Sequence, residues 1–443
     1  MRSQTRTSVL AVGFALSAPL ALADITVGPE GSGAQTDSIS DAIFNADEGE
    51  TIFVFAGDYT NIRVIGKSVR IIGEGPDLVT FAFDDPDTFG PGNRIEGLGP
   101  EQSAFFSGVA FDQKALSGLN GPLSLVANRG TLYFHDCDFR STGGAGQGTA
   151  AIFNCDDVTF DQCSFEGFEQ EPKVDPVTVS GGDGIYVEDS LLRLNACTVR
   201  GGDALQSGLF FSQGGIGIEA LDTTLILHNT SVTGGDALNS GLSTVGPGVG
   251  IVAGTSTVTV TGDATITGGS GDTKDPFVVV AGSPAVSFLD GLSSLTTSES
   301  VALTPGVGSE GTPAVDVELA GSSATVELFA RPGLTPSAPS GAPGTSFTVA
   351  FDGEPSATQL LALAFDTVLP YELENIAGAA QLDPLGTELV GLVTLDGNGS
   401  ASLSFDLPPL PSLTGTCGFF QSLQSGAAGG SRLSLPATFL VGQ

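Results

Sequence analysis

Two carboxylates stand at equivalent places in a repeated loop of this sequence. Asp203 and Asp236 each follow a Gly-Gly pair, in loops that share the pattern Gly-Gly-Asp-Ala-Leu-x-Ser-Gly-Leu and lie 33 residues apart. If the loops stack, these carboxylates can bind Ca²⁺ or a sugar hydroxyl, because carboxylate oxygens suit both ligands. The alternative is that duplication kept two copies of a turn, since Gly and Asp tolerate left-handed backbone.

A second group of carboxylates, Asp156, Asp157 and Asp161, is the other candidate for a calcium site. The sequence has no CxxC motif and no Cys/His pair with zinc spacing, and the two histidines, His135 and His228, fall at the ends of predicted strands. A GxSxG motif is also absent, so serine-hydrolase chemistry is not expected. We therefore expect either no cofactor or Ca²⁺.

The elements that must position these residues repeat every 33 residues. The segment that begins Gly184-Ile185 returns at Gly217-Ile218 and again at Gly250-Ile251. Apolar residues then alternate, as at Leu192 and Leu194, which is the period of a strand with one face inward. Short strands, Gly-rich corners and a fixed period predict an all-β solenoid, a parallel β-helix, over residues 24–330.

Cysteines mark one register of this solenoid. A position just after the alternating strand holds Cys in three repeats and should stack inward at a corner, about 4.8 Å from one coil to the next. Free buried thiols and a disulfide between two of them are both compatible with that spacing. Cys155 and Cys417 have no evident partner. The ladder is expected to comprise Cys137, Cys163, Cys197 and Thr230, followed by Asp263.

The N-terminal residues 1–23 have the features of a secretion signal. Arg2 and Arg6 precede an apolar run that ends in Ala21-Leu22-Ala23, a cleavage pattern, and no later apolar run is long enough to span a bilayer. We therefore expect an exported protein without a transmembrane segment, in the periplasm, at the cell surface or in the medium. Residues 36–46 have helical spacing and a capping pattern at Ser38 and Asp41, so a short helix should cover the open end of the solenoid.

Charge limits the partners. The 443 residues include 50 acidic and 15 basic ones, for a net charge of −35 at pH 7. This excludes nucleic acid and disfavours anionic membranes, because both repel a polyanion. Divalent cations and cationic surfaces are favoured, although the same acidity also serves solubility in a saline habitat.

The chain changes character after the repeats. Residues 331–344 are rich in Pro, Gly and Ser and predict an extended linker. Alternating segments at 346–351 and 401–407 then predict a small β-sandwich over residues 345–443. This C-terminal module resembles modules that recur on secreted bacterial proteins, and the resemblance implies a role in attachment or sorting.

The segments Asp37 to Ala46, Asp47 to Val54, Ala56 to Tyr59 and Ile65 to Gly75 resemble the opening of the pectin-lyase-like right-handed parallel β-helix family. That resemblance implies the fold. The family includes pectate lyases, polygalacturonases, pectin methylesterases and proteins without assigned activity. It implies the chemistry only weakly.

Within that resemblance, Asp183 and Asp203 match carboxylates of the polygalacturonase motif series and would serve as acid and base in inverting hydrolysis. The chain departs from the series in three places: it has Gly181 and Ala204 instead of Asn and Asp, and Gln213-Gly214-Gly215-Ile216 where the histidine of a Gly-His-Gly motif belongs. Two classes of function therefore remain. The favoured one is a non-catalytic surface that binds a polysaccharide or envelope component, and the alternative is a polysaccharide lyase or glycoside hydrolase.

Overall fold

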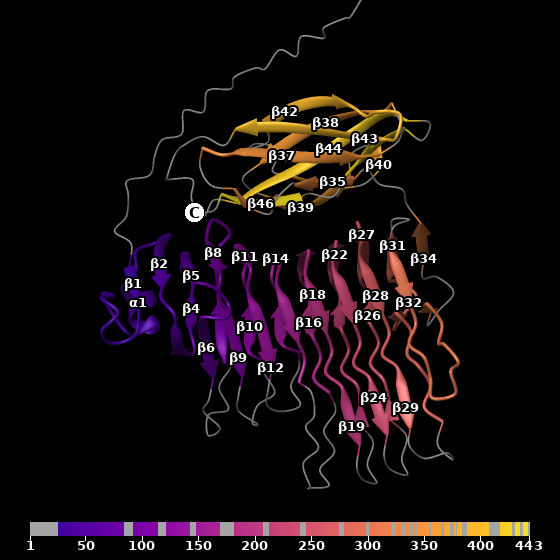
Figure 1. The fold of residues 1–443 in the computed structure, drawn as a ribbon, viewed down its shortest axis with the longest axis horizontal. Coiled ribbons are helices and arrows are strands. Elements are labelled where there is room, and N and C mark those ends of the chain that lie inside the picture. The colour runs from indigo at the N-terminus through magenta and orange to yellow at the C-terminus, as the bar shows by residue number, and fades with distance from the viewer. Residues whose placement is uncertain are drawn as a thin grey trace, which may run out of the picture.

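The computed structural model consists of a parallel β-helix followed by a smaller module of antiparallel sheets (Figure 1). The segment expected to be a secretion signal, residues 1–23, lies outside the described residues. The structure describes residues 25–83, 92–113, 121–141, 148–168, 181–206, 212–239, 245–273, 279–297, 301–319, 325–328, 333–336, 340–341, 344–353, 356–364, 367–372, 376–377, 379–382, 388–406, 417–427, 430–434 and 437–441.

Three parallel sheets, named A, B and C, run the length of the β-helix. Along the chain, a typical coil adds one strand to sheet C, then one to sheet A and then one to sheet B. The predicted parallel β-helix is therefore confirmed. Sheet A comprises β1 (Ile25–Val27), β2 (Glu50–Val54), β5 (Val69–Gly73), β8 (Ser103–Ser107), β11 (Thr131–His135), β14 (Asp157–Asp161), β17 (Leu191–Asn195), β22 (Thr224–His228), β27 (Thr257–Thr261), β31 (Ser294–Thr297) and β34 (Thr325–Leu328). Sheet B comprises β3 (Gly57–Thr60), β6 (Val79–Phe83), β9 (Ala110–Gln113), β12 (Asp138–Ser141), β15 (Ser164–Glu166), β18 (Thr198–Arg200), β23 (Ser231–Thr233), β28 (Thr265–Thr267) and β32 (Ala302–Thr304). Sheet C comprises β4 (Arg63–Ile65), β7 (Asn93–Glu96), β10 (Leu123–Val126), β13 (Ala150–Phe153), β16 (Ile185–Glu188), β21 (Ile218–Leu221), β26 (Ile251–Gly254), β30 (Val286–Phe288) and β33 (Val317–Leu319).

The interior of the β-helix is a stack of like side chains. The alternating apolar residues point inward, and Leu192 lies in register with Leu225 of the next coil. Aromatic rings continue the stack, with 4.9 Å between the ring centroids of Phe106 and Phe134 and 4.7 Å between those of Phe134 and Phe160. Because each coil buries its apolar face on the next, the repeat seen in the sequence is also the unit of packing.

A single left-handed residue turns the chain at the corner between sheets A and B, as at Ala196 (φ 50°) and Asn229 (φ 49°). The residue after it points inward. The structure stacks the cysteine ladder there: the Cys163 amide lies 3.4 Å from the Cys197 sulfur, the Cys197 amide lies 3.3 Å from the Thr230 hydroxyl, and the described thiols are free and buried. The positions expected on this ladder are Cys137, Cys163, Cys197 and Thr230.

Two features of the corners differ from expectation. The residue that follows Thr230 in the ladder is Ala264 and not Asp263, because the corner between β27 and β28 has three residues where the preceding corner has two. Cys155 belongs to a second ladder at the corner between sheets C and A, where its amide donates to Ser190 Oγ (3.0 Å). Hydroxyl-bearing residues continue that ladder, so Thr, Ser and Cys fill one structural role.

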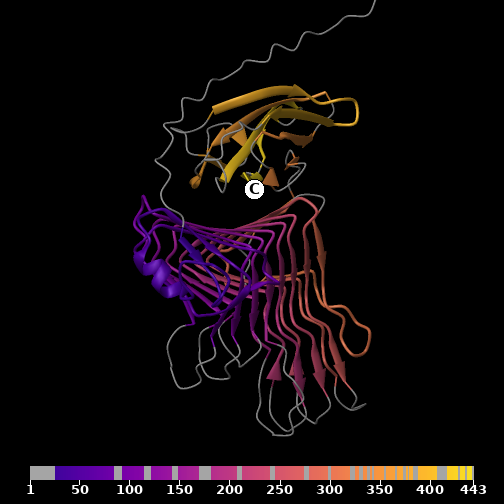
Figure 2. The ribbon, with the colours of Figure 1, turned by 60° about the vertical axis from the view of Figure 1, so that its left-hand side comes forward.

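Arms project from the later coils between sheets B and C, on the side away from the C-terminal module (Figure 2). Glycines form the neck of each arm and bond to one another: the Gly215 amide donates to the Gly202 carbonyl, and the Gly235 amide to the Gly215 carbonyl, both at 2.8 Å. A Cβ on Gly202 would lie 1.8 Å from the carbonyl oxygen of Phe168, so only glycine fits there. The arm strands are β19 (Ala204–Gln206), β24 (Ala237–Asn239) and β29 (Gly271–Thr273) in one sheet, and β20 (Ser212–Gln213) and β25 (Val245–Gly246) in another.

A short helix, α1 (Ile39–Asn45), covers the first coil, as predicted. The Ser38 hydroxyl accepts a hydrogen bond from the Asp41 amide (3.2 Å), which caps the helix. Ile39 and Ile43 are buried against the first strands, so the helix closes the end of the core.

The C-terminal module has its own apolar core, in which Phe347 and Phe351 from one sheet meet Phe420 from the other. The linker expected over residues 331–344 is instead partly built into this module, because two of its segments pair as strands β35 and β36. The first sheet comprises β35 (Gly333–Pro336), β37 (Ser346–Asp352) and β43 (Ser400–Asp406). The second comprises β36 (Ser340–Gly341), β46 (Ala437–Val441), β44 (Cys417–Ala427), β38 (Thr358–Ala364) and β42 (Glu388–Thr394), joined by β40 (Ile376–Ala377) and β45 (Gly430–Leu433), while β39 (Thr367–Glu372) pairs with β41 (Ala379–Leu382).

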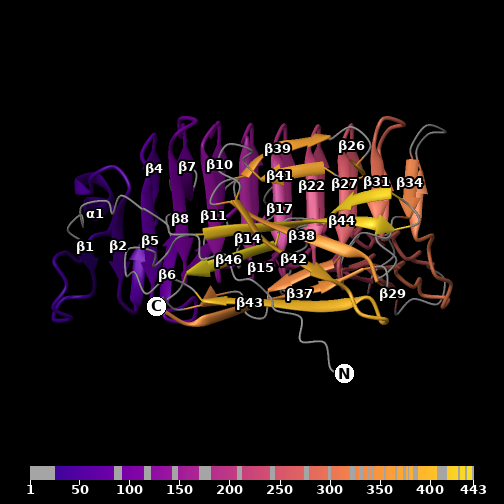
Figure 3. The ribbon, with the colours of Figure 1, turned by 90° about the horizontal axis from the view of Figure 1, so that it is seen from above.

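The module lies over the outer face of sheet A (Figures 1 and 3). Tyr133 of β11 meets Phe419 of β44 edge to face, with 6.4 Å between ring centroids. Sheets B and C keep outer faces that this module does not cover in these views.

Candidate functional site

The outer face of sheet C carries two neighbouring aromatic rings. Strand alternation turns Ile152 inward and Phe153 outward on β13, while Tyr186 and Glu188 point outward on β16. The ring centroids of Phe153 and Tyr186 are 5.4 Å apart, with 42° between the ring planes, and both side chains are half-buried. Two half-buried rings on neighbouring strands offer an apolar platform on which a sugar ring can pack.

Carboxylates surround this platform. The Tyr186 hydroxyl donates to Glu188 Oε2 (2.8 Å), and Glu219 of β21 lies in register beside Tyr186. Burial, the bond to Glu188 and the charge of Glu219 raise the pKa of Tyr186 to about 12. Burial also raises the pKa of Glu219. The hydroxyl therefore stays protonated at neutral pH, and the carboxylate oxygens can accept hydrogen bonds from sugar hydroxyls.

Asp183 stands at the entrance to β16, beside this group. Its Oδ1 accepts a hydrogen bond from the Ile216 amide of the next coil (2.7 Å). Burial raises the pKa of Asp183 to about 6, and the nearby charge of Glu219 acts in the same direction, although the bond from Ile216 opposes both. A carboxyl group that titrates near pH 6 can hold or release a proton under ordinary conditions, which is the property of a general acid.

The other two Gly-Gly-Asp carboxylates have the same backbone role as Asp183. Asp203 Oδ1 accepts from the Asp236 amide (2.8 Å), and Asp236 Oδ1 accepts from the Ser270 amide (2.7 Å). Arg200 donates to the second oxygen of Asp203 (2.6 Å). Each carboxylate thus joins its own coil to the next by a hydrogen bond. This is the structural role of a repeated turn, and it needs no bound ligand.

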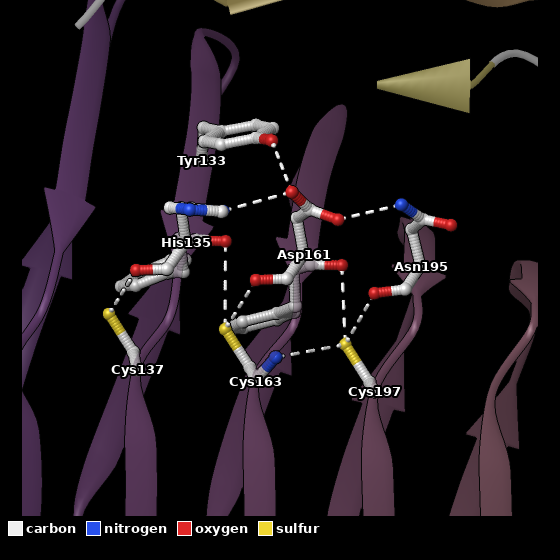
Figure 4. Close-up of polar contacts among 9 residues, drawn as sticks. Tyr133, His135, Cys137, Asp161, Cys163, Asn195 and Cys197 are labelled. Carbon is white, nitrogen blue, oxygen red and sulfur yellow. Dashed lines mark hydrogen bonds and ion pairs between the residues drawn. The ribbon is translucent and has the colours of Figure 1, made fainter. Parts of the chain in front are cut away.

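The candidates Asp156, Asp157 and Asp161 separate in the structure. Asp156 is exposed, while Asp157 forms a buried ion pair with Arg193. Asp161 is 0 % exposed and lies among three donors of the outer face of sheet A (Figure 4). These donors are the Tyr133 hydroxyl (3.1 Å), His135 Nδ1 (2.9 Å) and Asn195 Nδ2 (2.6 Å).

Sequence reasoning missed that Asp161 belongs to a polar row that crosses sheet A. Successive strands place His135, Asp161, Asn195 and His228 side by side in register. Each of these residues stands two positions before a member of the cysteine ladder, and that spacing is the signal that could have revealed the row. Burial lowers the pKa of His228 to about 4, so this imidazole is neutral at pH 7, with Nδ1 3.1 Å from the Thr261 hydroxyl.

Neither of the two sets of carboxylates proposed from the sequence is gathered into a metal site among the described residues. Among the described residues, no group of three or more His, Cys, Asp or Glu side chains is placed to hold a metal ion. Within the same part of the chain, no helix is long and apolar enough to cross a membrane.

Known proteins resemble this chain in fold. No family model and no curated protein matches its sequence. The enzymatically active domain of tailspike protein 2 from bacteriophage CBA120 aligns with 95% of this chain and 76% of its own, at 10% identity and a TM-score of 0.38. Pectin methylesterase PemA from Erwinia chrysanthemi aligns with 68% of this chain and 92% of its own, at 13% identity and a TM-score of 0.26.

A third structure is tailspike protein gp49 of Acinetobacter baumannii bacteriophage Fri1, a capsular polysaccharide depolymerase, which aligns with 89% of this chain and 77% of its own at 12% identity and a TM-score of 0.22. The parallel β-helix that the expected resemblance implies is confirmed by the three parallel sheets of this structure. Similarity this distant does not identify an activity for this chain.

Proposed function

We propose that this chain is an exported polysaccharide-binding protein that holds its ligand on the outer face of sheet C. The half-buried pair of rings at Phe153 and Tyr186 is the observation that carries the proposal. Apolar faces of sugar rings pack on aromatic rings, while Glu188 and Glu219 supply hydrogen-bond acceptors beside them. The side chains come from stacked strands, which favours a repeating polymer laid across the coils.

The charge of this face selects among polysaccharides. Asp183, Glu188 and Glu219 are acidic. The arginines described in the same row, Arg94 and Arg63, lie three and four strands from Tyr186, and both are paired with Glu96. An anionic polyuronate is repelled by such a face, whereas neutral and amino-substituted glycans are not. We expect binding of the second kind.

Affinity electrophoresis in gels that contain a neutral glucan, chitosan or polygalacturonate tests both parts of this proposal. Tyr186→Ala and Phe153→Ala each remove one ring and should weaken binding about tenfold, or about 1.4 kcal/mol. Tyr186→Phe keeps the ring and should retain most of the affinity. Phe44→Ala removes an exposed ring of α1, which lies at the first coil and away from β13 and β16, and is the matched control.

Two results would contradict the proposal. One is equal binding by Tyr186→Ala and Phe44→Ala, which would remove the aromatic platform from the ligand site. The other is tighter binding of polygalacturonate than of the neutral and amino glycans, which would show that the acidic face does not set specificity.

Hydrolysis of the bound glycan is a second candidate, favoured by the pKa of Asp183 near 6. Such a carboxyl group could protonate the leaving oxygen while Glu219 activates water. A lyase reading has less support, since the described part of this face offers no arginine beside the platform. Reducing-end release by the wild-type chain and its loss in Asp183→Asn would establish hydrolysis, and binding without release would exclude it.

A further inference from the structure

The middle strands of sheet A have buried outward side chains, whereas the outward side chains of β18 on sheet B are exposed. Outward side chains of a bare β-helix meet solvent, as Thr198 and Arg200 do on sheet B. On sheet A, however, Thr159 is 2 % exposed and Arg193 is 5 % exposed although both point away from the core. All five residues of β14 are buried, so something covers this sheet from outside.

The C-terminal module provides that cover. Figures 1 and 3 place it over the middle strands of sheet A. The contact includes a small apolar cluster in which Phe105 and Tyr133 of the β-helix meet Ala364 and Phe419 of the module. The rings of Phe105 and Tyr133 stack at 5.7 Å, and Phe419 meets Tyr133 edge to face.

The β-helix and the module keep separate cores. The main cluster of buried apolar residues runs from Val27 to Leu295, and the second runs from Leu334 to Ala437 without sharing a residue with the first. Among the described residues, the cluster around Tyr133 and Phe419 is the one apolar cluster to which both parts contribute. Losing this contact would therefore leave each core intact.

Much of the rest of the covered face is polar. It holds the ion pair of Asp157 and Arg193 and the network around Asp161. Burying such charges gains little net free energy, because desolvation offsets their attraction. Contacts between domains that are small and polar allow relative motion, whereas large apolar ones do not.

We propose that the C-terminal module is a lid that docks on and undocks from the outer face of sheet A as a folded unit. Phe419 anchors the closed state by its contact with Tyr133 and Phe105. The polar row fixes where the module sits without making the contact permanent. Undocking exposes His135, Asp161 and Arg193 together while the β-helix remains folded. This inference concerns a different face from the proposed glycan site and does not depend on it.

Hydroxyl-radical footprinting with mass spectrometry tests the lid, because it reports side-chain access normalised to the intrinsic reactivity of each residue type. In the wild-type chain, Tyr133 should be labelled more slowly than half-buried Tyr186 and faster than Phe134, which points into the core. Phe419→Ala should raise labelling of Tyr133 and His135 at least fivefold and leave Phe134 unchanged.

Phe44→Ala is the matched control and should change none of these rates. A second variant, Tyr133→Ser, breaks the same contact from the β-helix side and should raise labelling of Phe419, which guards against misfolding of the module in Phe419→Ala. The proposal is overturned if Tyr133 is as protected as Phe134 in the wild type and stays so in Phe419→Ala. It is also overturned if Tyr133 and Phe134 become accessible together, since that reports unfolding of the coil.

Discussion

Substituting His228 by Asn should make the β-helix less sensitive to acid. Burial lowers the pKa of this imidazole to about 4, from an ordinary value near 6.5, so the folded chain takes up its proton later than the unfolded chain. Acidification from pH 6.5 towards 4 therefore favours the unfolded state. The cost through this one group is about 2 kcal/mol at pH 5 and approaches about 3 kcal/mol below pH 4.

Urea unfolding followed by far-UV circular dichroism at pH 7.5 and pH 5.0 measures this effect. Other groups titrate in the same range, so the quantity of interest is the difference in unfolding free energy between His228→Asn and wild type. We expect that difference to shift by about 2 kcal/mol in favour of the variant when the pH falls to 5.0. Asn is the natural choice because Asn195 occupies the same row one coil earlier.

The control is Thr261→Val, which removes the hydroxyl partner of His228 without removing a titrating group. Its effect on the unfolding free energy should be nearly the same at both pH values. The reasoning would be refuted if His228→Asn and wild type differed equally at pH 7.5 and 5.0. That result would mean that the folded chain protonates this imidazole as readily as the unfolded chain does.

Three further predictions concern other parts of the molecule. Asp183→Asn should stabilise the chain by about 3 kcal/mol at pH 7.5 and by only about 0.5 kcal/mol at pH 4, because the raised pKa of Asp183 costs stability only as the unfolded chain ionises; denaturation at the two pH values measures this. Gly202→Ala should lower the melting temperature sharply or prevent folding, since its Cβ would meet a backbone oxygen at 1.8 Å, whereas Gly246→Ala, with nothing within 4 Å, should be tolerated. Buried thiols should react with a disulfide reagent only as the chain unfolds, because burial raises the pKa of Cys155 and Cys163 and limits access; a native-state thiol titration would contradict this if it detected them at once. The thiols concerned are Cys137, Cys155, Cys163 and Cys197.

The repeat made the β-helix predictable from sequence. Alternation at Leu192 and Leu194 fixes which side chains point inward, and a 33-residue offset fixes the register with the next coil. Capping at Ser38 predicted the helix that covers the end. Such features are local or periodic, so they can be recognised in a single amino-acid sequence. The predicted ladder missed one position, Ala264, because the corner between β27 and β28 has one residue more than the preceding corner.

The candidate sites were less accessible to sequence reasoning. Asp183 was singled out through its resemblance to a catalytic motif, but its raised pKa depends on burial and on Glu219, which only the fold brings near. Phe153 and Tyr186 lie on consecutive coils of different length, so no repeating interval in the sequence indicates that the two rings are in contact.

The docking of the module was not predicted for a related reason. Phe419 belongs to the module and Tyr133 to the β-helix, and a contact between two independently packed parts has no periodic signature. Asp161 and His135 are buried on the side of sheet A that the module covers, whereas the sequence suggested only a calcium site at Asp156, Asp157 and Asp161.

Radical footprinting of the chain with and without a saturating neutral or amino glycan tests the proposed binding surface most directly. The account predicts that labelling of Phe153 and Tyr186 falls several-fold in the complex while labelling of Phe44 does not change. Protection of another face, with Phe153 and Tyr186 labelled as in the free chain, would contradict it.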